Sequence, residues 1–297
     1  MEFQRIKIPY PAVGTLVNIE PLSDIHVGGI FHDKKKFEER RNRIRDDPTC
    51  FTILMGDLFD CTDPDNKFFD MKTRDPELPD LEDQFQYLLK MLLPIRHKIL
   101  GVLTGNHDER QRKRHYDDVV LRLTNALNAY YPPEFNVPDL NSAGLVRLIE
   151  DTEVPYTIKY LRYLGITRLV FYRKFADSGK EHIDSSWDIF TAHGGYSGQL
   201  VGGNINALEK IAMWFSADVY LTGHTHNAVA YKMEKVAMDS RGHLQKIVKI
   251  FGSCGSFAQP YMEGVHTYPE VKILAASRVG TITISIDPYN RKLQAHE

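Results

Sequence analysis

The sequence predicts an α/β protein whose strands alternate with helices and whose C-terminal strands add a second sheet, giving a sandwich-like core. Two observations predict this class. Short apolar runs of strand length recur along the chain with helical stretches between them, and run after run ends in a cluster of polar side chains. In open α/β sheets, ligands bind at the carboxyl ends of the strands, so these clusters are expected to converge on one site.

Five runs predict strands that end in such clusters. The first is interrupted by Pro21, which disfavours a continuous strand there. The other four are rich in aromatic or β-branched residues and close on Gly, Asp or His. In chain order the runs are Thr15–His26, Cys50–Asp57, Lys98–Asp108, Trp187–Gly194 and Asp218–His226.

Helices are predicted between these strands. Phe85–Leu93 precedes the third run, and Ile205–Phe215 precedes the fifth with its apolar residues on one helical face. The basic stretch Lys34–Arg45 is predicted to be an exposed helical face, because Phe37 and Ile44 are spaced to bury one stripe.

The remaining chain completes a single domain, predicted to cover residues 13–297. The acid- and Pro-rich segment 60–83 is predicted to be a surface insertion. Residues 139–173 mix strand-like runs with polar turns. The runs HLQKIVKIFG and VGTITISI near the C-terminus are two further strand candidates.

Composition excludes several classes of protein. The chain has 297 residues, of which 42% are hydrophobic, and a formal net charge of -2, so no strong overall field recruits nucleic acid or a membrane surface. No window approaches the roughly 18 apolar residues of a membrane span. Three cysteines without a CxxC pair argue against a disulfide framework and for a reducing compartment. The expectation is a cytoplasmic protein that does not bind membranes.

The polar clusters supply carboxylate, amide and imidazole groups and no thiolate. This set suits Mn²⁺, Fe²⁺, Zn²⁺ or Ni²⁺ better than a structural zinc cage. The groups are too many for one ion. Two ions roughly 3.5 to 4 Å apart can share one carboxylate, an arrangement that recurs in phosphatases and nucleases. Phosphate ester hydrolysis is therefore the expected reaction.

The ordered motifs D-x-H, GD, GNHD, HG and GHTH resemble those of the calcineurin-like metallophosphoesterase family. They are Asp24-Ile25-His26, Gly56-Asp57, Gly105-Asn106-His107-Asp108, His193-Gly194 and Gly223-His224-Thr225-His226. The resemblance implies a four-layer α/β/β/α fold with two mixed sheets flanked by helices.

The resemblance also implies which residues bind each metal ion and which act in catalysis. Asp24, His26 and His226 would hold one metal ion. Asn106, His193 and His224 would hold the other, and Asp57 would bridge the two. A metal-bridging hydroxide would attack phosphorus in line, with Mn²⁺ as the expected metal. His107 would act on the leaving-group oxygen as general acid or charge stabiliser. Asp108 either orients His107 or caps a helix that starts near Glu109.

Two neighbouring segments leave alternatives open. Arg110, Arg112, Lys113 and Arg114 follow the catalytic loop and either hold phosphates of a polymeric substrate or form a solvated first helical turn. The Gly-rich stretch Gly194–Gly203 either cradles a phosphate or lets the loop wrap His193 around the metal.

The favoured function is hydrolysis of phosphodiester bonds in nucleic-acid ends or nucleotides. GDLFD and GNHD resemble the forms in DNA-repair nucleases and phosphodiesterases, and the segment after His193 is similar to that of phage and prophage phosphoesterases. A phosphomonoesterase acting on nucleotides or phosphoproteins is the first alternative. A non-catalytic scaffold is the second, although no motif residue is missing. No heptad pattern predicts self-association.

Overall fold

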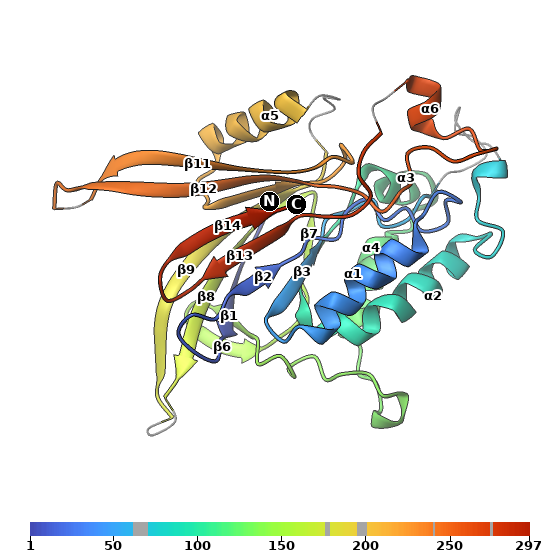
Figure 1. The fold of residues 1–297 in the computed structure, drawn as a ribbon. Helices are drawn as coiled ribbons and strands as arrows, with labels where there is room; N and C mark the ends of the chain where they lie inside the picture. The colour runs from blue at the N-terminus through green and yellow to red at the C-terminus, as the bar shows by residue number, and fades with distance from the viewer. Residues whose placement is uncertain (62–70, 176–178, 195–200, 240, 274–275) are drawn as a thin grey trace.

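The computed structural model describes residues 1–61, 71–175, 179–194, 201–239, 241–273 and 276–297. In this part of the chain the elements form two mixed β-sheets packed face to face, with helices on the outer faces (Figure 1). The predicted α/β/β/α sandwich is confirmed.

The six-stranded sheet carries the first half of the site. Its order is β14 (Lys292–His296), β13 (Thr283–Asp287), β2 (Val17–Ile19), β3 (Cys50–Leu54), β4 (Ile99–Leu103) and β7 (Tyr160–Arg162). The strands from β2 to β7 are parallel, and β13 runs antiparallel to β2. Every residue of β3 and β4 is buried, as expected for parallel strands covered on both faces.

The eight-stranded sheet carries the second half. Its order is β11 (Ala228–Met238), β12 (Leu244–Cys254), β10 (Val219–Thr222), β9 (Glu181–Ala192), β8 (Leu164–Lys174), β1 (Glu2–Pro9), β5 (Val146–Ile149) and β6 (Thr152–Pro155). β9, β10 and β12 are mutually parallel, so the ends of β9 and β10 lie at the same edge.

Helices complete the outer layers (Figure 1). On the six-stranded sheet lie α1 (Lys34–Asp46), α2 (Leu81–Leu92), η2 (Leu93–Lys98) and α4 (Val119–Asn128). The eight-stranded sheet is covered near β10 and β12 by α5 (Val201–Trp214). The other helical elements of the described chain are η1 (Met71–Thr73), α3 (Asn106–His115), η3 (Pro133–Phe135) and α6 (Tyr268–Lys272). No described helix is both long and apolar enough to cross a membrane.

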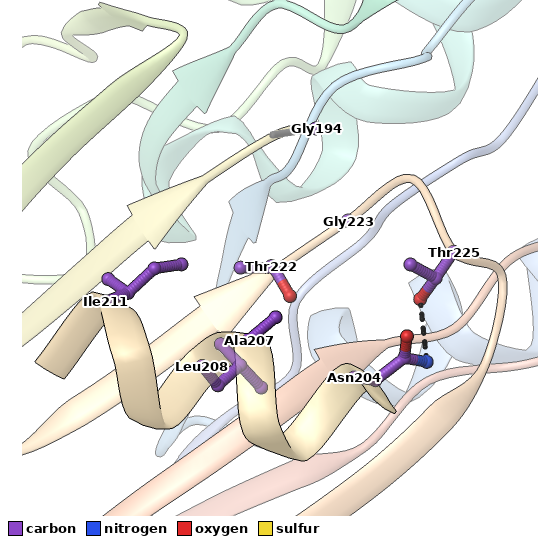
Figure 2. Close-up of a pocket in the computed structure, with 8 residues that line it drawn as sticks. All are labelled: Gly194, Asn204, Ala207, Leu208, Ile211, Thr222, Gly223 and Thr225. Carbon is purple, nitrogen blue, oxygen red and sulfur yellow. Dashed lines mark hydrogen bonds between the residues drawn. The ribbon is translucent and has the colours of Figure 1, made fainter. Parts of the chain in front are cut away.

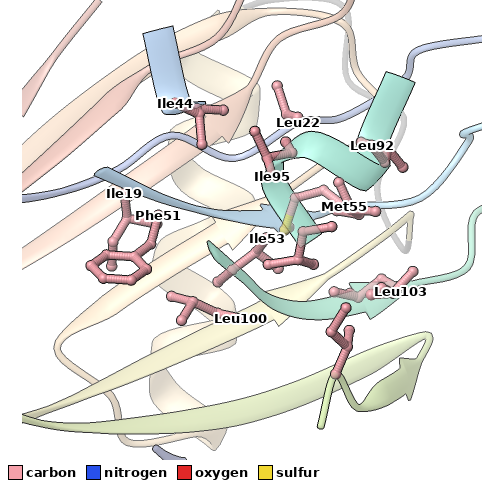
Figure 3. Packing of buried hydrophobic residues seen from close by; sticks show 14 of the residues in the cluster. Ile19, Leu22, Ile44, Phe51, Ile53, Met55, Leu92, Ile95, Leu100 and Leu103 are labelled. Atoms are coloured by element: carbon pink, nitrogen blue, oxygen red, sulfur yellow. The ribbon is translucent and has the colours of Figure 1, made fainter. Parts of the chain in front are cut away.

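The main hydrophobic core lies on both faces of the six-stranded sheet. Figure 3 shows Ile53, Met55 and Leu103 packed with Leu92 and Ile95 from the helical layer. Burying one such side chain contributes about 1.5–3 kcal/mol. A smaller cluster, which includes Phe190, Leu208, Tyr220 and Phe251, packs α5 onto the eight-stranded sheet.

Several elements differ from the sequence prediction. The first strand ends at Ile19, and after Pro21 the pairing continues as isolated bridges, from Leu22 to Leu54 and from Val27 to Phe59. α3 begins at Asn106, ahead of the expected start near Glu109. The two C-terminal strand candidates, β12 and β13, lie in different sheets.

Two boundaries are also informative. The predicted domain starts at residue 13, and β1 lies before it as an inner strand between β8 and β5. Of the predicted insertion 60–83, residues 62–70 lie outside the described residues. Asp60 and Cys61 are buried, and residues 81–83 already belong to α2.

Candidate metal centre

The predicted ligands leave the ends of strands in both sheets. Asp24 and His26 follow β2, and Asp57 follows β3. Asn106 and His107 begin α3 directly after β4. From the other sheet come His193 after β9, and His224 and His226 after β10. Packing the sheets face to face therefore brings residues from far apart in the sequence to one edge of the sandwich.

Asp24, His26 and His226 form the first group of possible ligands, with one atom of each lying within 4.8 Å of the others. His226 Nε2 lies 3.2 Å from Asp24 Oδ1 and 3.3 Å from His26 Nε2. Asp24 and His26 are buried, whereas the side chain of His226 is 31% exposed, so this group opens toward solvent through His226.

Asp57, His193 and His224 form the second group. Asp57 Oδ2 lies 3.2 Å from His193 Nε2, and Asp57 Oδ1 accepts the backbone N–H of His107 at 2.8 Å. That N–H places the start of α3 against Asp57. Asn106 is the first residue of the helix and is exposed. Its role as a ligand stays a prediction, as does the division of the other residues between two ions.

The imidazole tautomers fit a divalent cation. His193 Nδ1 lies 2.6 Å from the carbonyl oxygen of Met55, which can only accept, so Nδ1 carries the proton and Nε2 offers a lone pair. Within the described residues, His224 Nδ1 is buried without a hydrogen-bond partner, and His193 Nε2 is buried with the Asp57 carboxylate 3.2 Å away but no well-aligned hydrogen bond. Buried polar atoms normally have partners, and a metal ion bound to these nitrogens would supply one. The donor set therefore fits two divalent ions.

The electrostatics of the site also favour cations. Burial raises the pKa of Asp24, but His193 and His226 lower it further, to about 2. Burial lowers the pKa of His193, but the charges of Asp57 and Asp24 raise it to about 10. The negative charges of Asp57 and Asp24, which favour a proton on His193, would also attract a divalent ion. Binding of the ion would release that proton.

The backbone is strained where these ligands lie. Asp24, His26, Asp57, His224 and His226 all have positive φ, between 49° and 85°. The left-handed region costs about 1–2 kcal/mol for an L-residue, and such outliers concentrate at functional sites. The glycines of the motifs allow close approach. A Cβ at Gly105 would collide with Asp57, and one at Gly223 would lie 2.7 Å from His193 Nδ1.

His107 and Asp60 form a third group with His26 that the sequence analysis did not identify. Asp60 Oδ1 lies 3.8 Å from His107 Nδ1 and 3.7 Å from His26 Nδ1, and His107 Nδ1 lies 2.7 Å from the carbonyl oxygen of Asp60. Burial lowers the pKa of His107. The charges of Asp57 and Asp60 raise this pKa by more, and the charge of Arg110 lowers it slightly, so the net shift is upward. The position of Asp60 in GDLFD, three residues after Asp57, is the signal that could have identified it.

Asp108 points at backbone rather than at His107. Its carboxylate accepts the N–H groups of Gly105 and Phe59 at 3.0 Å and that of Leu58 at 3.3 Å. The bond from Gly105 is half of a capping box on α3, which matches the capping alternative. Asp108 therefore ties the α3 start to the loop after β3. Burial and Asp57 raise its pKa to about 6.

The basic run on α3 divides into two kinds of residue. Arg112 Nε donates to the two carboxylate oxygens of Glu109 at 3.0 and 2.9 Å, and Lys113 Nζ lies 3.8 Å from the same group. Glu109 is buried, so these cations neutralise a buried carboxylate. Arg110 is half-buried and has no ion pair within the described residues. Of the Gly-rich stretch 194–203, residues 195–200 lie outside the described residues, and Gly202 and Gly203 begin α5.

Figure 2 shows a small cavity behind the GHTH loop, lined by α5 and the end of β10. Asn204 on α5 is 3% exposed and donates from Nδ2 to Thr225 Oγ1 at 3.3 Å. Thr225 Oγ1 lies 2.8 Å from Ser253 Oγ. Since Thr225 sits between His224 and His226, this network holds the loop that carries both histidines.

Comparisons with known proteins identify the family. Residues 22–228 match the family model for calcineurin-like phosphoesterases. A search of curated proteins found no match. The chain is similar to the structure of a conserved uncharacterized protein, a predicted phosphoesterase, from Streptococcus pneumoniae TIGR4, with 15% identity and a TM-score of 0.34 over 92% of this chain and 84% of that one. It is also similar to wild-type Vps29 complexed with Zn²⁺ from Entamoeba histolytica, with 10% identity and a TM-score of 0.35 over 95% and 97%.

The two structural likenesses are too low to carry an argument, so the assignment rests on the family model. That model covers more than half of the chain and contains every predicted ligand. This chain belongs to the calcineurin-like phosphoesterase family, whose members bind divalent metal ions and hydrolyse phosphate esters.

Proposed function

We propose that this protein is a metal-dependent phosphodiesterase that hydrolyses phosphodiester bonds in nucleic-acid ends or nucleotides. The observation that carries the proposal is the convergence of two carboxylate–imidazole groups on one edge, with His107 beside them. The ring centroids of His107 and His26 are 4.7 Å apart.

Two divalent ions fit the residues present. Asp24, His26 and His226 would hold one, His193, His224 and Asn106 would hold the other, and Asp57 would contact both. When bound, such ions supply Lewis-acid activation of a water molecule and of the phosphoryl oxygens. The absence of thiolate ligands favours Mn²⁺, with Fe, Zn or Ni as alternatives.

His107 is proposed to donate a proton to the leaving-group oxygen. Its Nδ1 is held 2.7 Å from the carbonyl oxygen of Asp60, which can only accept a hydrogen bond, so Nδ1 is protonated. Burial lowers the pKa of His107, but the charges of Asp57 and Asp60 raise it overall, which favours the imidazolium form in which Nε2 also carries a proton. Nε2 is therefore the proposed donor, on a side chain that is 26% exposed at the site. Proton donation by a positioned group typically accelerates such reactions by about 100- to 10,000-fold.

The preference for diesters and the cellular compartment are supported by sequence features. The GDLFD and GNHD forms resemble those of phosphodiesterases and nucleases. The formal net charge of -2 favours a small substrate or a nucleic-acid end over a long duplex. Cys50, Cys61 and Cys254 are buried and form no disulfide among the described residues, which suits the proposed cytoplasmic location.

The experiment compares turnover of bis-p-nitrophenyl phosphate and p-nitrophenyl phosphate by metal-free protein re-supplied with Mn²⁺. His107→Ala is expected to lose diester turnover while retaining Mn²⁺, because His107 is not a proposed ligand. Asp57→Asn is expected to lose both turnover and Mn²⁺ affinity. His296→Ala, an exposed histidine far along the chain from the motifs, serves as the control.

The outcomes separate the alternatives. Diester turnover that disappears in both variants supports the proposal and justifies assays on DNA and RNA ends. A clear preference for the monoester contradicts it in favour of a phosphomonoesterase. Turnover of neither ester in any metal contradicts it in favour of a non-catalytic scaffold.

A further inference from the structure

We propose that Arg110 binds the phosphoryl group of the substrate beside His107 and so sets the affinity of the site for phosphate esters. This inference rests on the proposed function and deepens it, since it assigns a substrate-binding residue that lies outside the metal-ligand motifs. Four features of the described residues support it.

The first feature is the position of Arg110 on α3. An α-helix turns by about 100° per residue, so Arg110 projects about 40° from Asn106 and about 60° from His107, between the two. Side chains in a helix lean toward its N-terminus. The guanidinium of Arg110 is therefore directed back toward the turn that carries Asn106 and His107, which faces the ligand groups.

The second feature is burial without a partner. Arg110 is half-buried, and within the described residues its Nη1 is a buried atom with no hydrogen-bond acceptor. A buried donor without an acceptor destabilises the protein, and a charged donor does so more strongly. A guanidinium offers a planar pair of donors that matches phosphate oxygens, so a bound phosphoryl group would satisfy it.

The third feature is the contrast with the neighbouring cations. Arg112 and Lys113 face the buried carboxylate of Glu109, which neutralises part of their positive charge. Arg112 and Lys113 are thus both paired with Glu109. Arg110 has no carboxylate partner among the described residues, so its charge remains available to a ligand.

The fourth feature is the spacing between Arg110 and His107. The two residues are three positions apart on α3, so their side chains are neighbours on the helix surface and the positive charge of Arg110 lies beside the imidazole. A phosphoryl group whose leaving oxygen faces His107 would thus lie within reach of the same positive charge. There the guanidinium would bind a non-bridging phosphoryl oxygen, which stays on phosphorus during the reaction. This contact would strengthen binding of both the substrate and the phosphorylated product.

The test measures binding of inorganic phosphate to the Mn²⁺-loaded protein by titration calorimetry. Arg110→Ala is expected to weaken phosphate binding by about 10- to 100-fold, as expected for loss of a charge-assisted hydrogen bond. Arg110→Lys is expected to recover part of the loss, because it restores the charge without the planar pair of donors. Lys113→Ala is the matched control, since it removes the same charge from the same helix at a side chain that is 65% exposed.

Mn²⁺ stoichiometry is measured in each variant, and wild-type content in Arg110→Ala shows that the site remains intact. Phosphate affinity in Arg110→Ala equal to that of the wild type overturns the assignment. Equal weakening by Lys113→Ala overturns it too, because the effect would then belong to the overall field of the helix. Wild-type protein that binds no phosphate also overturns it.

Kinetics on bis-p-nitrophenyl phosphate separate this inference from the proposed function. If the wild type turns over the diester and Arg110→Ala matches it in KM and in phosphate affinity, the function stands and the role of Arg110 fails. If the wild type shows no turnover but Arg110→Ala loses phosphate affinity, the phosphate site stands and the phosphodiesterase fails.

Discussion

Individual residues at the metal centre are held in conformations that their neighbours impose. Asp24 and His26 have positive φ, and their backbone N–H groups donate to the carbonyls of Gly56 at 3.0 Å and Asp57 at 3.1 Å. The N–H of His224 donates to the carboxylate of Asp24. The loops of the site thus hold one another in the strained geometry.

His32, outside the ligand groups, is predicted to make the protein sensitive to acid. It is 6% exposed, with its ring against Phe37 and Tyr87. Burial lowers its pKa to about 4, although the backbone carbonyl of Ile25 opposes this shift. The folded protein therefore holds His32 neutral, while the unfolded chain binds a proton below its ordinary pKa of 6.5. Its stabilising contribution is complete above pH 6.5 and is lost as the pH falls toward 4.

The measurement is urea unfolding of metal-free protein between pH 7 and pH 4. A shift of this size corresponds to at most about 3 kcal/mol, and His32→Phe is expected to remove that part of the pH dependence. His243→Phe, at a side chain that is 77% exposed, should leave the pH dependence unchanged. An unaltered pH profile in His32→Phe would refute the assignment.

At the scale of elements, one short 3-10 helix, η2, fixes the ends of two longer helices. η2 carries Lys98, which donates to the carbonyls of Ile44 at 2.7 Å and Asp47 at 2.6 Å at the C-terminal end of α1. Arg96 in the same element donates to the carbonyls of Leu127 and Ala129 at the end of α4. Cations suit the negative ends of helices, so one 3-10 helix anchors two helices over the sheet that carries Asp57.

Asn204 on α5 is predicted to act on metal affinity through the GHTH loop. The cavity beside it is about 10 Å³, room for about one water molecule. Because Asn204 holds Thr225 between His224 and His226, Asn204→Ala is expected to loosen both histidines and lower Mn²⁺ affinity. Groups that orient metal ligands typically contribute about 10- to 100-fold in affinity or activity, and we expect the lower end for a 3.3 Å bond.

Mn²⁺ titration of the metal-free variant checks this expectation. Asn206→Ala is a matched control, since Asn206 lies on the same helix and is exposed. Unchanged Mn²⁺ affinity in Asn204→Ala, or an equal loss in Asn206→Ala, would rule out a specific role for the Asn204–Thr225 bond.

At the scale of the whole molecule, the two ligand groups join the two sheets. Asp24, His26 and Asp57 come from the six-stranded sheet, whereas His193, His224 and His226 come from the eight-stranded sheet. Each group contains residues from both sheets. An ion bound to either group therefore links the two layers of the sandwich.

Metal binding is accordingly predicted to stabilise the fold. A ligand present at 100 times its Kd stabilises the folded state by about 2.7 kcal/mol per site, so two sites should raise the Tm by about 5–10 °C. Thermal unfolding of metal-free protein with and without Mn²⁺ measures this shift. The double variant Asp24→Asn, Asp57→Asn should show none. A wild-type Tm that does not respond to Mn²⁺ would contradict ion binding across the sheets.

Much of the site was predictable from the sequence because its motifs are local. Gly105-Asn106-His107 and Gly223-His224-Thr225-His226 each follow a strand, and strand ends in such sheets meet at one edge. The same locality predicted the helix Lys34–Arg45, whose apolar spacing buries Phe37 and Ile44. The α/β class followed from alternation of strand and helix patterns, which depends only on neighbours along the chain.

Other features were decided only by tertiary structure. Asp60 is part of the GDLFD sequence, but its approach to His26 and His107 depends on how the loop after β3 packs against α3. The sheet membership of β1, β12 and β13 depends on pairing between distant segments, which periodicity does not encode. Arg112 lies three residues after Glu109 and pairs with it along the helix, which is a local effect. The burial of Glu109 and of Arg110 Nη1, by contrast, depends on how α3 packs against the rest of the fold.

The amino-acid sequence by itself thus determined the chemistry available to this protein: a set of carboxylate, amide and imidazole groups, each beside a strand end. Tertiary structure set which of these groups face one another, which nitrogens lack a partner, and which charged groups are buried. The physical reason is that ligand type is a property of single residues, whereas distance, burial and electrostatic field arise only when two sheets and their loops pack together.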